Sequence, residues 1–281
     1  MGPIEIRPAS VQQLEHVLGW AREEGWGPGL EDAAAFHAAD PGGFLIGWLG
    51  TLPIGSISLV RYGEDQAFLG LFIVRPAFRG RGFGKTLWQA AMDRAGTRTI
   101  GLDAVPAQVG RYAAAGFVRA HGTTRWGGHL RGLVTTRSLV RPLGPEDAVA
   151  VAEYDALAFG APRPEFLAGW LRPTATRQSE AYFEDGAIRG YGSVRRTFAG
   201  WKIGPLFADS AAIAEALLAT LVTPAGTDEV AVDIPERNLA GTALAKRLGF
   251  SAGFETTRMY RGPAPALPLD RIFGVTTLEL G

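Results

Sequence analysis

Apolar residues recur along the first half of the chain with two different periods, which alternate in a regular order. The segment 67–74 is almost continuously apolar and rich in β-forming side chains, as is typical of a buried strand. Further on, Leu87, Ala91 and Ala95 lie on one face of a helix. The same patterns predict strands at 4–7, 43–50, 53–62, 67–75, 98–104 and 117–126, and helices at 10–24, 31–38, 83–95 and 107–115.

The second half repeats this order of elements. It predicts strands at 139–142, 178–183, 187–198, 200–208, 229–234 and 250–260, and helices at 146–158, 163–171, 210–222 and 238–248. Short matches recur at an offset of 133 or 134 residues, which indicates a duplication: Arg7-Pro8 with Arg141-Pro142, Gly116-Phe117 with Gly249-Phe250, and Thr123-Thr124-Arg125 with Thr256-Thr257-Arg258. We therefore predict an α/β protein of two domains with one fold and a mixed sheet, at 1–130 and 141–262, joined by a linker at 131–140.

A glycine-rich loop joins the fourth predicted strand of the first half to its third helix. Gly80, Gly82 and Gly84 lack the Cβ atoms that would keep a ligand away from the backbone. The first N–H groups of the helix have no acceptor within it, and Arg79 and Arg81 add positive charge beside them. The loop therefore predicts a phosphate-binding site.

Counting residues excludes two nucleotide-binding motifs at this loop. A Walker A motif needs glycine six residues before its lysine, but position 79 is arginine. A Gly-x-Gly-x-x-Gly fingerprint needs glycine at 85 or 87, where Lys85 and Leu87 stand. An ordinary glycine-rich turn is the alternative. The pattern Arg-x-x-Gly-x-Gly at 79–84 resembles the acetyl-CoA loop of the GCN5-related N-acetyltransferase (GNAT) superfamily, whose element order is also the predicted one.

The resemblance implies an N-acetyltransferase that takes acetyl-CoA as co-substrate and needs no metal. It covers nearly all 281 residues and is similar to bacterial tandem acetyltransferases whose second half is an acetyltransferase-like domain. The loop would hold the pyrophosphate, and the end of the preceding strand would hold the pantetheine arm and polarise the thioester carbonyl. The implied cofactor-binding residues are Phe72, Ile73, Val74, Arg79, Gly80, Arg81, Gly82, Phe83, Gly84 and Lys85.

Two residues are candidates for proton transfer. Superfamily members often carry a tyrosine four residues before a Gly-Phe pair, where its hydroxyl can protonate the departing CoA thiolate, and Tyr112 stands four residues before Gly116. The alternative for Tyr112 is an aromatic ring packed between helix and sheet. Asp103, near the end of a predicted strand, is the candidate base or anchor for a cationic acceptor. Capping the next helix or pairing with an arginine are equal alternatives for Asp103.

The second half lacks these cofactor features. Its strand 200–208 runs directly into Asp209, which is expected to cap the next helix and to oppose an anion there. Ala245 stands where Tyr112 stands in the first half. The superfamily's helix-opening asparagine shows the reverse pattern, because Asn238 has Val105 as its counterpart in the first half. We therefore expect cofactor binding in the first domain alone.

Composition and net charge limit the classes of molecule that the protein is expected to bind. The formal net charge is zero and no dense basic stripe is present, so nothing favours nucleic acid or an anionic membrane surface, and no apolar run reaches the ~20 residues of a membrane span. The absence of cysteine excludes disulfides, thiolate metal sites and a cysteine nucleophile, and is compatible with the cytoplasm, where we place the protein. The four histidines form no metal-ligand spacing. The segment 24–30, which contains Trp26, corresponds to the loop that shapes the acceptor pocket in the superfamily. Trp20 and Trp26 are therefore candidates to line that pocket or to cover a cation, and packing at the domain interface is their alternative role.

We predict that the first domain transfers an acetyl group directly from acetyl-CoA to the amine of a small molecule or peptide. The alternatives are an acyl-CoA sensor or interaction protein without turnover and, more distantly, a P-loop NTPase. The tail 263–281 begins rich in proline and becomes strand-like at 271–278. We expect the tail to add to a sheet and to fix the two domains together, and we expect the second domain to serve as a wall of the acceptor pocket.

Overall fold

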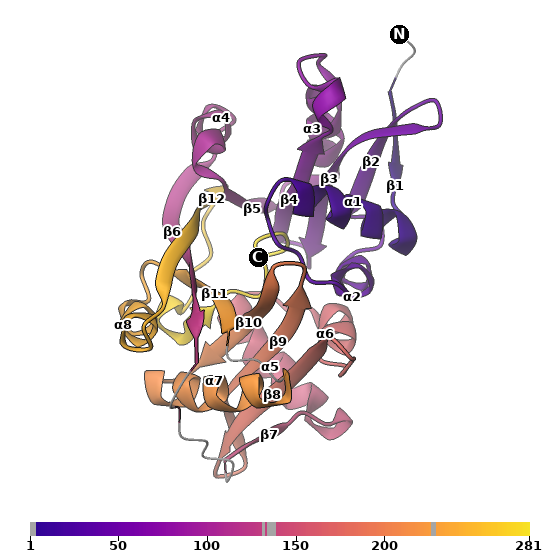
Figure 1. Cartoon of the computed structure of the whole chain (residues 1–281). Helices are drawn as coiled ribbons and strands as arrows, with labels where there is room; N and C mark the ends of the chain where they lie inside the picture. The colour runs from indigo at the N-terminus through magenta and orange to yellow at the C-terminus, as the bar shows by residue number, and fades with distance from the viewer. Residues whose placement is uncertain (1–3, 131–132, 134–138, 226–228) are drawn as a thin grey trace.

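The computed structural model describes residues 4–130, 133, 139–225 and 229–281, so most of the expected linker at 131–140 lies outside the described residues (Figure 1). The first half contains β1 (Glu5–Pro8), α1 (Val11–Glu23), α2 (Asp32–Ala39), β2 (Phe44–Leu49), β3 (Leu52–Tyr62), β4 (Gln66–Val74), α3 (Phe83–Ala95), β5 (Thr99–Ala104), α4 (Val109–Ala114) and β6 (Val118–His129). The second contains β7 (Val140–Pro142), α5 (Ala148–Phe159), α6 (Pro164–Trp170), β8 (Arg177–Glu184), β9 (Ala187–Thr197), β10 (Gly200–Ala208), α7 (Ala211–Ala225), β11 (Glu229–Pro235), α8 (Leu239–Arg247) and β12 (Ser251–Arg261), and the tail adds β13 (Ile272–Gly274).

These elements confirm the order predicted from the sequence, with ends displaced by no more than a few residues. Local interactions explain several of the ends. Ser10 caps α1, because its hydroxyl accepts the Gln13 N–H at 3.3 Å and the Gln13 side chain accepts the Ser10 N–H at 2.9 Å. α5 ends at Gly160, whose φ of +89° stops the helix in the left-handed region.

All strands join one continuous sheet in which the last strands of the two halves are exchanged. The order is β1-β2-β3-β4-β5-β12-β6-β11-β10-β9-β8-β7, with β13 beside β10. β12, from the second half, pairs antiparallel with β5 of the first, while β6, from the first half, pairs antiparallel with β11 of the second. Figure 1 shows β6 and β12 side by side between the two halves. Each half therefore completes the sheet of the other.

Reciprocal ion pairs accompany this exchange. Arg258 of β12 lies opposite Asp103 of β5 and binds its carboxylate with two hydrogen bonds of 2.8 Å. Arg125 of β6 lies opposite Asp233 of β11 and binds it at 2.7 and 3.2 Å. The two arginines occupy equivalent positions of the sequence repeat. Each copy of the repeat therefore contributes one arginine that joins the two halves.

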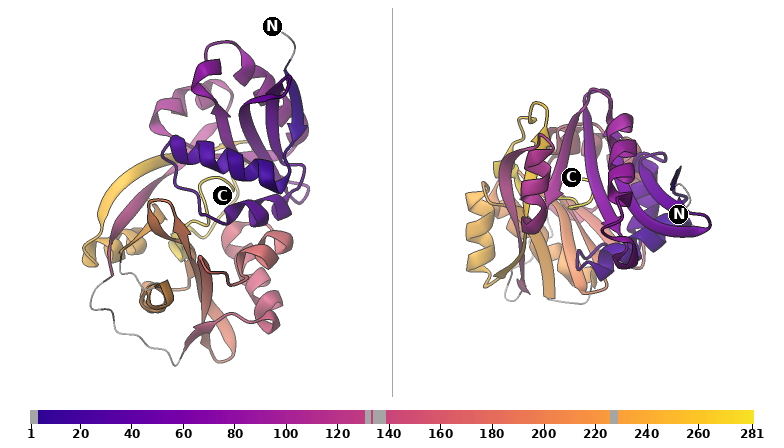
Figure 2. Two further views of the ribbon diagram at one scale, coloured as in Figure 1. Left: turned by 45° about the vertical axis from the view of Figure 1, so that its right-hand side comes forward. Right: turned by 90° about the horizontal axis from the view of Figure 1, so that it is seen from above.

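The two halves also share a core. Phe36 of α2 stacks on Trp170 of α6 with ring centroids 6.3 Å apart, and both rings are fully buried. The same apolar cluster includes Leu280 of the tail, and the chain end lies at the centre of the molecule, between the halves (Figure 2). The halves are therefore packed together by helices and tail as well as by strands.

Candidate active site

A cavity opens where β4 and β5 separate. Their parallel pairing extends as far as Leu69 and Leu102 and then ends. β4 bulges at this point, where Leu71 has a φ of +45° and the register with β3 shifts. The space between the strands widens into a cavity of about 900 Å³ that residues of both halves line. Its volume is that of a small-molecule or cofactor site.

Most of the predicted cofactor residues line this cavity. These are Phe72, Ile73, Val74, Arg79, Gly80, Gly82, Phe83 and Gly84. Arg81 and Lys85 are not among the lining residues; both side chains are exposed, and the Arg81 guanidinium lies 5.7 Å from the ring centre of Phe78. The glycine loop and the end of β4 are thus brought together at one opening, whereas two of the predicted cations lie outside it.

The N-terminus of α3 is open to a ligand. Gly82 is its N-cap residue, with a φ of +83° and no side-chain hydrogen bond to the first turn. A Cβ atom at Gly80 or Gly82 would meet nothing within 4 Å, so the space in front of the helix is empty of protein. The first amides of α3 and its dipole therefore present positive charge to the cavity mouth.

Arg79 lies at this mouth but is turned toward protein acceptors. Its Nε donates to the Val74 carbonyl at 2.8 Å, and its guanidinium forms an ion pair with Glu24 at the end of α1. Both side chains are partly exposed, so this pair contributes little stability and can open at small cost. The sequence did not identify Glu24, because a glutamate at a helix end matches no motif.

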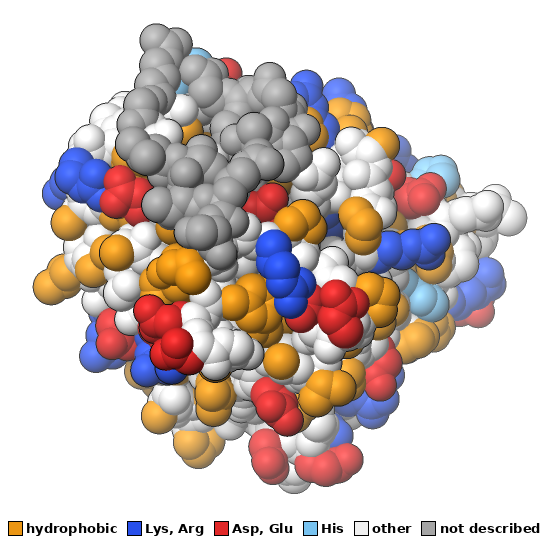
Figure 3. Space-filling view, turned by 90° about the horizontal axis from the view of Figure 1, so that it is seen from below, with side chains coloured by type: hydrophobic (Ala, Val, Ile, Leu, Met, Phe, Trp, Pro, Cys, Tyr) orange, Lys and Arg blue, Asp and Glu red, His pale blue; other side chains and the backbone are white. Residues whose placement is uncertain are grey.

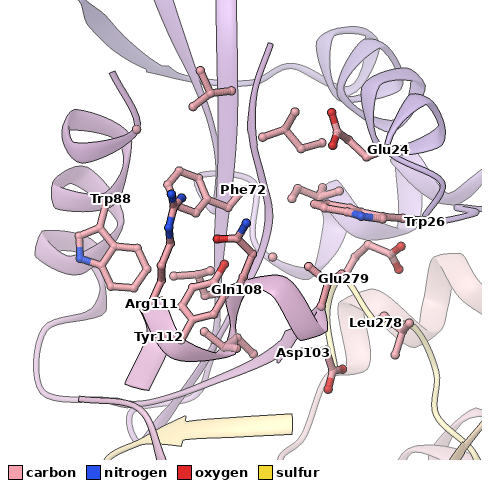
Figure 4. A pocket seen from close by; sticks show the side chains of 18 of the residues that line it. Glu24, Trp26, Phe72, Trp88, Asp103, Gln108, Arg111, Tyr112, Leu278 and Glu279 are labelled. Carbon is pink, nitrogen blue, oxygen red and sulfur yellow. The ribbon is translucent and has the colours of Figure 1, made fainter. Parts of the chain in front are cut away.

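Tyr112 reaches the cavity from α4 (Figure 4). Its ring packs against Trp88 and Phe117, with centroids 6.0 and 5.9 Å away. Burial raises the pKa of Tyr112 to about 12, and the nearby Arg111 opposes this only in part. The hydroxyl therefore stays protonated at neutral pH. Both expected features of Tyr112, a packed ring and a place at the cavity, are present together.

Asp103 also lines the cavity, but its carboxylate is already bound. The two hydrogen bonds from Arg258 occupy both oxygens, and the side chain is fully buried. Of the alternatives considered for Asp103, pairing with an arginine is the one that the geometry favours. Its part as a base stays a prediction.

The two tryptophans expected at the acceptor pocket lie in different places. Trp26 lines the cavity, on the wall opposite Tyr112 (Figure 4). Trp20 is not among the lining residues; it packs on the apolar cluster around α1, and the Arg75 guanidinium lies 5.6 Å from its ring centre. For Trp20, the packing alternative therefore fits the structure better than a substrate contact.

The second half contributes to the cavity from β12 and from the tail. The lining residues from this part are Phe254, Thr256, Leu278 and Glu279. The role of the second half as a wall of the acceptor pocket stays a prediction. Gln108, from the turn before α4, is a further polar group beside Tyr112 (Figure 4). The sequence singled out neither Gln108 nor Glu279, because an isolated polar residue in a turn or tail carries no motif.

The corresponding space in the second half is filled by the protein itself. The parallel pairing of β10 with β11 ends at Ile203 and Val232, as that of β4 with β5 does in the first half. Here β13 pairs with the continuing β10, and the Val275 N–H donates to the Asp233 carbonyl at 2.9 Å. Tail backbone therefore fills the wedge-shaped space between β10 and β11, whereas the corresponding space between β4 and β5 stays open as the cavity.

Of two residues discussed for the second half, Asp209 has another role than expected, and Asn238 opens its helix as expected and also binds the tail. Asp209 accepts the Tyr154 hydroxyl at 2.9 Å, and Ser210, not Asp209, accepts the Ile213 N–H in the first turn of α7, at 3.4 Å. The expected capping by Asp209 is wrong, because the helix begins one residue later than a cap at 209 requires. Asn238 caps α8 through Gly241 at 2.7 Å and donates to the tail carbonyls of Asp270 and Ile272.

Replacing Asn238 is expected to loosen this tail. Asn238→Ala removes the cap and both bonds to the tail, and should lower the free energy of unfolding by about 1–2 kcal/mol. Asn238→Ser keeps a capping oxygen but cannot reach the tail, so it should lose about half as much. Urea denaturation measures both. An Asn238→Ala protein as stable as the parent would contradict this account of the tail.

In the described part of the chain, no group of three or more histidine, aspartate and glutamate side chains is placed to hold a metal ion. Among the same residues, no helix combines the length and the apolar character needed to cross a membrane. On the face seen from below, acidic, basic and hydrophobic side chains are interspersed (Figure 3).

Comparison with known families matches both halves to acetyltransferases. Residues 11–123 match the model of the Acetyltransferase (GNAT) family, and residues 151–274 match a second model, an Acetyltransferase (GNAT) domain. A holothin acyltransferase of Pseudoalteromonas sp. (strain SANK 73390) is 32% identical over 277 residues, which are 98% of this chain and 94% of that protein.

Solved structures show the same fold over the whole chain. A crystal structure of a candidate acetyltransferase from Pyrococcus horikoshii superimposes with a TM-score of 0.81 at 25% identity and covers 100% of this chain and 97% of that one. A tandem GNAT protein from the clavulanic acid biosynthesis pathway gives a TM-score of 0.64 at 19% identity, over 93% of this chain and 100% of that one.

Proposed function

Because the chain belongs to the GNAT family of acyltransferases, we propose that its first half transfers an acetyl group from acetyl-CoA to the amine of a small molecule or peptide. The observation that carries this proposal is the single cavity that joins three features: the open N-terminus of α3, the separated end of β4, and the Tyr112 hydroxyl. A phosphate group, an extended arm and a leaving thiolate would each find a suitable partner there.

The cavity supports the following division of work. The amides after Gly82 would bind the pyrophosphate, and the backbone of Phe72 to Val74 would hold the pantetheine arm and polarise the thioester carbonyl. The amine, held near Trp26, would attack the carbonyl carbon. The C–S bond would then break, and Tyr112 would protonate the departing thiolate. Asp103, held by Arg258, would shape the floor of the site.

The filled wedge between β10 and β11 supports one acyl-CoA site per chain rather than two. We propose the domain division accordingly: 1–130 as the catalytic unit, 141–262 as the degenerate unit, and 263–281 as the tail that joins them. Because the chain has no cysteine and carries no net charge, we also propose that it works in the cytoplasm on an acceptor other than nucleic acid.

The proposal is tested by screening primary amines with acetyl-CoA and following CoA release with a thiol reagent. The protein contains no cysteine, so every thiol detected comes from CoA. We expect at least one amine to raise CoA release about tenfold or more above the rate without amine, and mass spectrometry to show the acetylated amine. Calorimetry should give one acetyl-CoA per chain. Tight binding without turnover of any amine would favour the sensor alternative instead.

A further inference from the structure

Glu279, in the tail, lines the cavity on the wall opposite Tyr112 (Figure 4). Its side chain is 3% exposed, and its Oε2 has no hydrogen-bond partner among the described residues. A buried carboxylate oxygen without a hydrogen-bond partner is costly, and such groups in native proteins often have a functional role.

The tail holds this carboxylate in a fixed position. On one side of Glu279, the Thr276 hydroxyl accepts a hydrogen bond from Arg163 at 2.8 Å. On the other side, the Leu280 carbonyl accepts one from the Tyr62 hydroxyl at 2.9 Å. Between them, the tail backbone lies directly on β4, where a Cβ atom at Gly70 would overlap the Glu279 carbonyl oxygen. The side chain is therefore presented by backbone that is secured at both ends.

Charged groups surround Glu279, but its Oε2 forms a hydrogen bond with none of those described. Lys202 of β10 and Arg125 of β6 form ion pairs with Asp233, and Arg195 of β9 lies 3.3 Å from Asp32 of α2. Four of these groups act on Glu279 electrostatically: Lys202, Arg195 and Arg125 lower its pKa, and Asp32 raises it. Asp233 forms ion pairs with two of the three cations. Burial is the largest effect, and the pKa of Glu279 is raised overall.

We infer that Glu279 is the general base that takes the proton from the acceptor's ammonium group before the nitrogen attacks the thioester. This inference rests on the proposed function. The ammonium transfers one proton to the carboxylate, directly or through a water, and becomes a neutral amine. Its nitrogen forms the new C–N bond as the C–S bond breaks. Tyr112 protonates the thiolate, and the resulting phenolate recovers a proton from the nitrogen of the new amide. The products are the amide, CoA and protonated Glu279, which returns its proton to solvent.

Glu279→Gln tests this role because it keeps the shape of the side chain and removes the proton acceptor. We expect kcat to fall about 10²-fold, and the rise of kcat with pH that reports the ionisation of Glu279 to disappear. In the parent enzyme, that rise should lie at a higher pH than an ordinary glutamate would give, since only the ionised form acts as a base. Formate should partly restore turnover in Glu279→Ala.

Stability distinguishes this catalytic role from a structural one. A carboxyl whose pKa is raised by folding destabilises the native state once the pH exceeds its value in the unfolded chain, so Glu279→Gln should raise the Tm at pH 8. A side chain that holds the tail in place would give the opposite change when replaced. Glu180→Gln is the matched control: Glu180 is buried on β8, its Oε2 also lacks a partner among the described residues, and it does not line the cavity. Its turnover should match the parent.

The binding of acetyl-CoA separates failure of this inference from failure of the proposed function. Calorimetry on Glu279→Gln should show one site of unchanged affinity, as in the parent. A variant that binds acetyl-CoA and acetylates the amine found in the screen at the parental kcat, with the pH dependence intact, overturns the role of Glu279 and leaves the proposed function standing. An increase in KM alone also overturns it, since Glu279 would then only attract the cationic acceptor.

Discussion

Gly82→Asp is expected to abolish measurable acetyl-CoA binding while the chain stays folded. The new carboxylate would stand at the N-cap of α3, where it can accept the free amides and repel the pyrophosphate. We expect a loss of affinity of about 10³-fold or more, equivalent to ~4 kcal/mol, which calorimetry would measure as the disappearance of a binding signal.

Backbone strain has to be separated from charge in this experiment. Gly82 has a φ of +83°, so any side chain there strains the loop by about 1–2 kcal/mol. Gly82→Ala carries this strain without the charge and should keep a measurable part of the affinity. Undiminished binding by a folded Gly82→Asp protein, or two equal sites in the parent, would contradict the placement of the cofactor at α3.

Tyr112→Phe is expected to reduce kcat by about 10²-fold and to leave acetyl-CoA affinity within a few-fold of the parent. The ring would keep its contacts with Trp88 and Phe117, so only the proton donor is lost. Steady-state rates with the amine found by screening, together with calorimetry on the same protein, measure the two effects separately. Tyr154→Phe, which changes a hydroxyl bonded to Asp209 in the second half, is the control that should keep full turnover.

The pH dependence gives Tyr112 a second check. Its pKa is raised to about 12 by burial, and the acid must be protonated to act. The parent enzyme should therefore show no fall in kcat from ionisation of Tyr112 below roughly pH 10. A decline centred near neutral pH that vanishes in Tyr112→Phe would mean that the hydroxyl ionises far more easily than its surroundings imply. Unchanged turnover of the variant, with chemistry rate-limiting, would make Tyr112 a packing residue.

The sequence predicts the elements and the position of the cofactor loop well, because both depend on local patterns. Periodicity locates the strands and helices, and glycines at 80, 82 and 84 mark a backbone that a ligand can approach. Charge alone is a weaker guide, since Arg81 and Lys85 match the motif but are exposed and are not among the residues that line the cavity. Long side chains can turn in several directions, whereas a missing Cβ fixes a property of the backbone.

The strand exchange could not be read from the sequence because the repeat makes β6 and β12 equivalent. Arg125 and Arg258 stand in the same Thr-Thr-Arg motif, and each lies opposite an aspartate on the neighbouring strand. By sequence, either strand could therefore pair with either half of the sheet. Glu279 was missed for a different reason, namely that its importance depends on where the tail passes. Gly70 and Gly204 carry a signal that could have revealed it: both lie within predicted strands, and tail backbone crosses both.

The exchange of β6 and β12 also governs how the chain can fold as it is synthesised. β5 ends at Ala104, but its neighbour β12 begins only at Ser251, so the ribosome must add well over a hundred residues before the first sheet is complete. Contacts between segments so distant in sequence form slowly. The two halves, although copies of one fold, are therefore expected to fold together as a single cooperative unit. The catalytic half reaches its final structure only after the degenerate half has been synthesised.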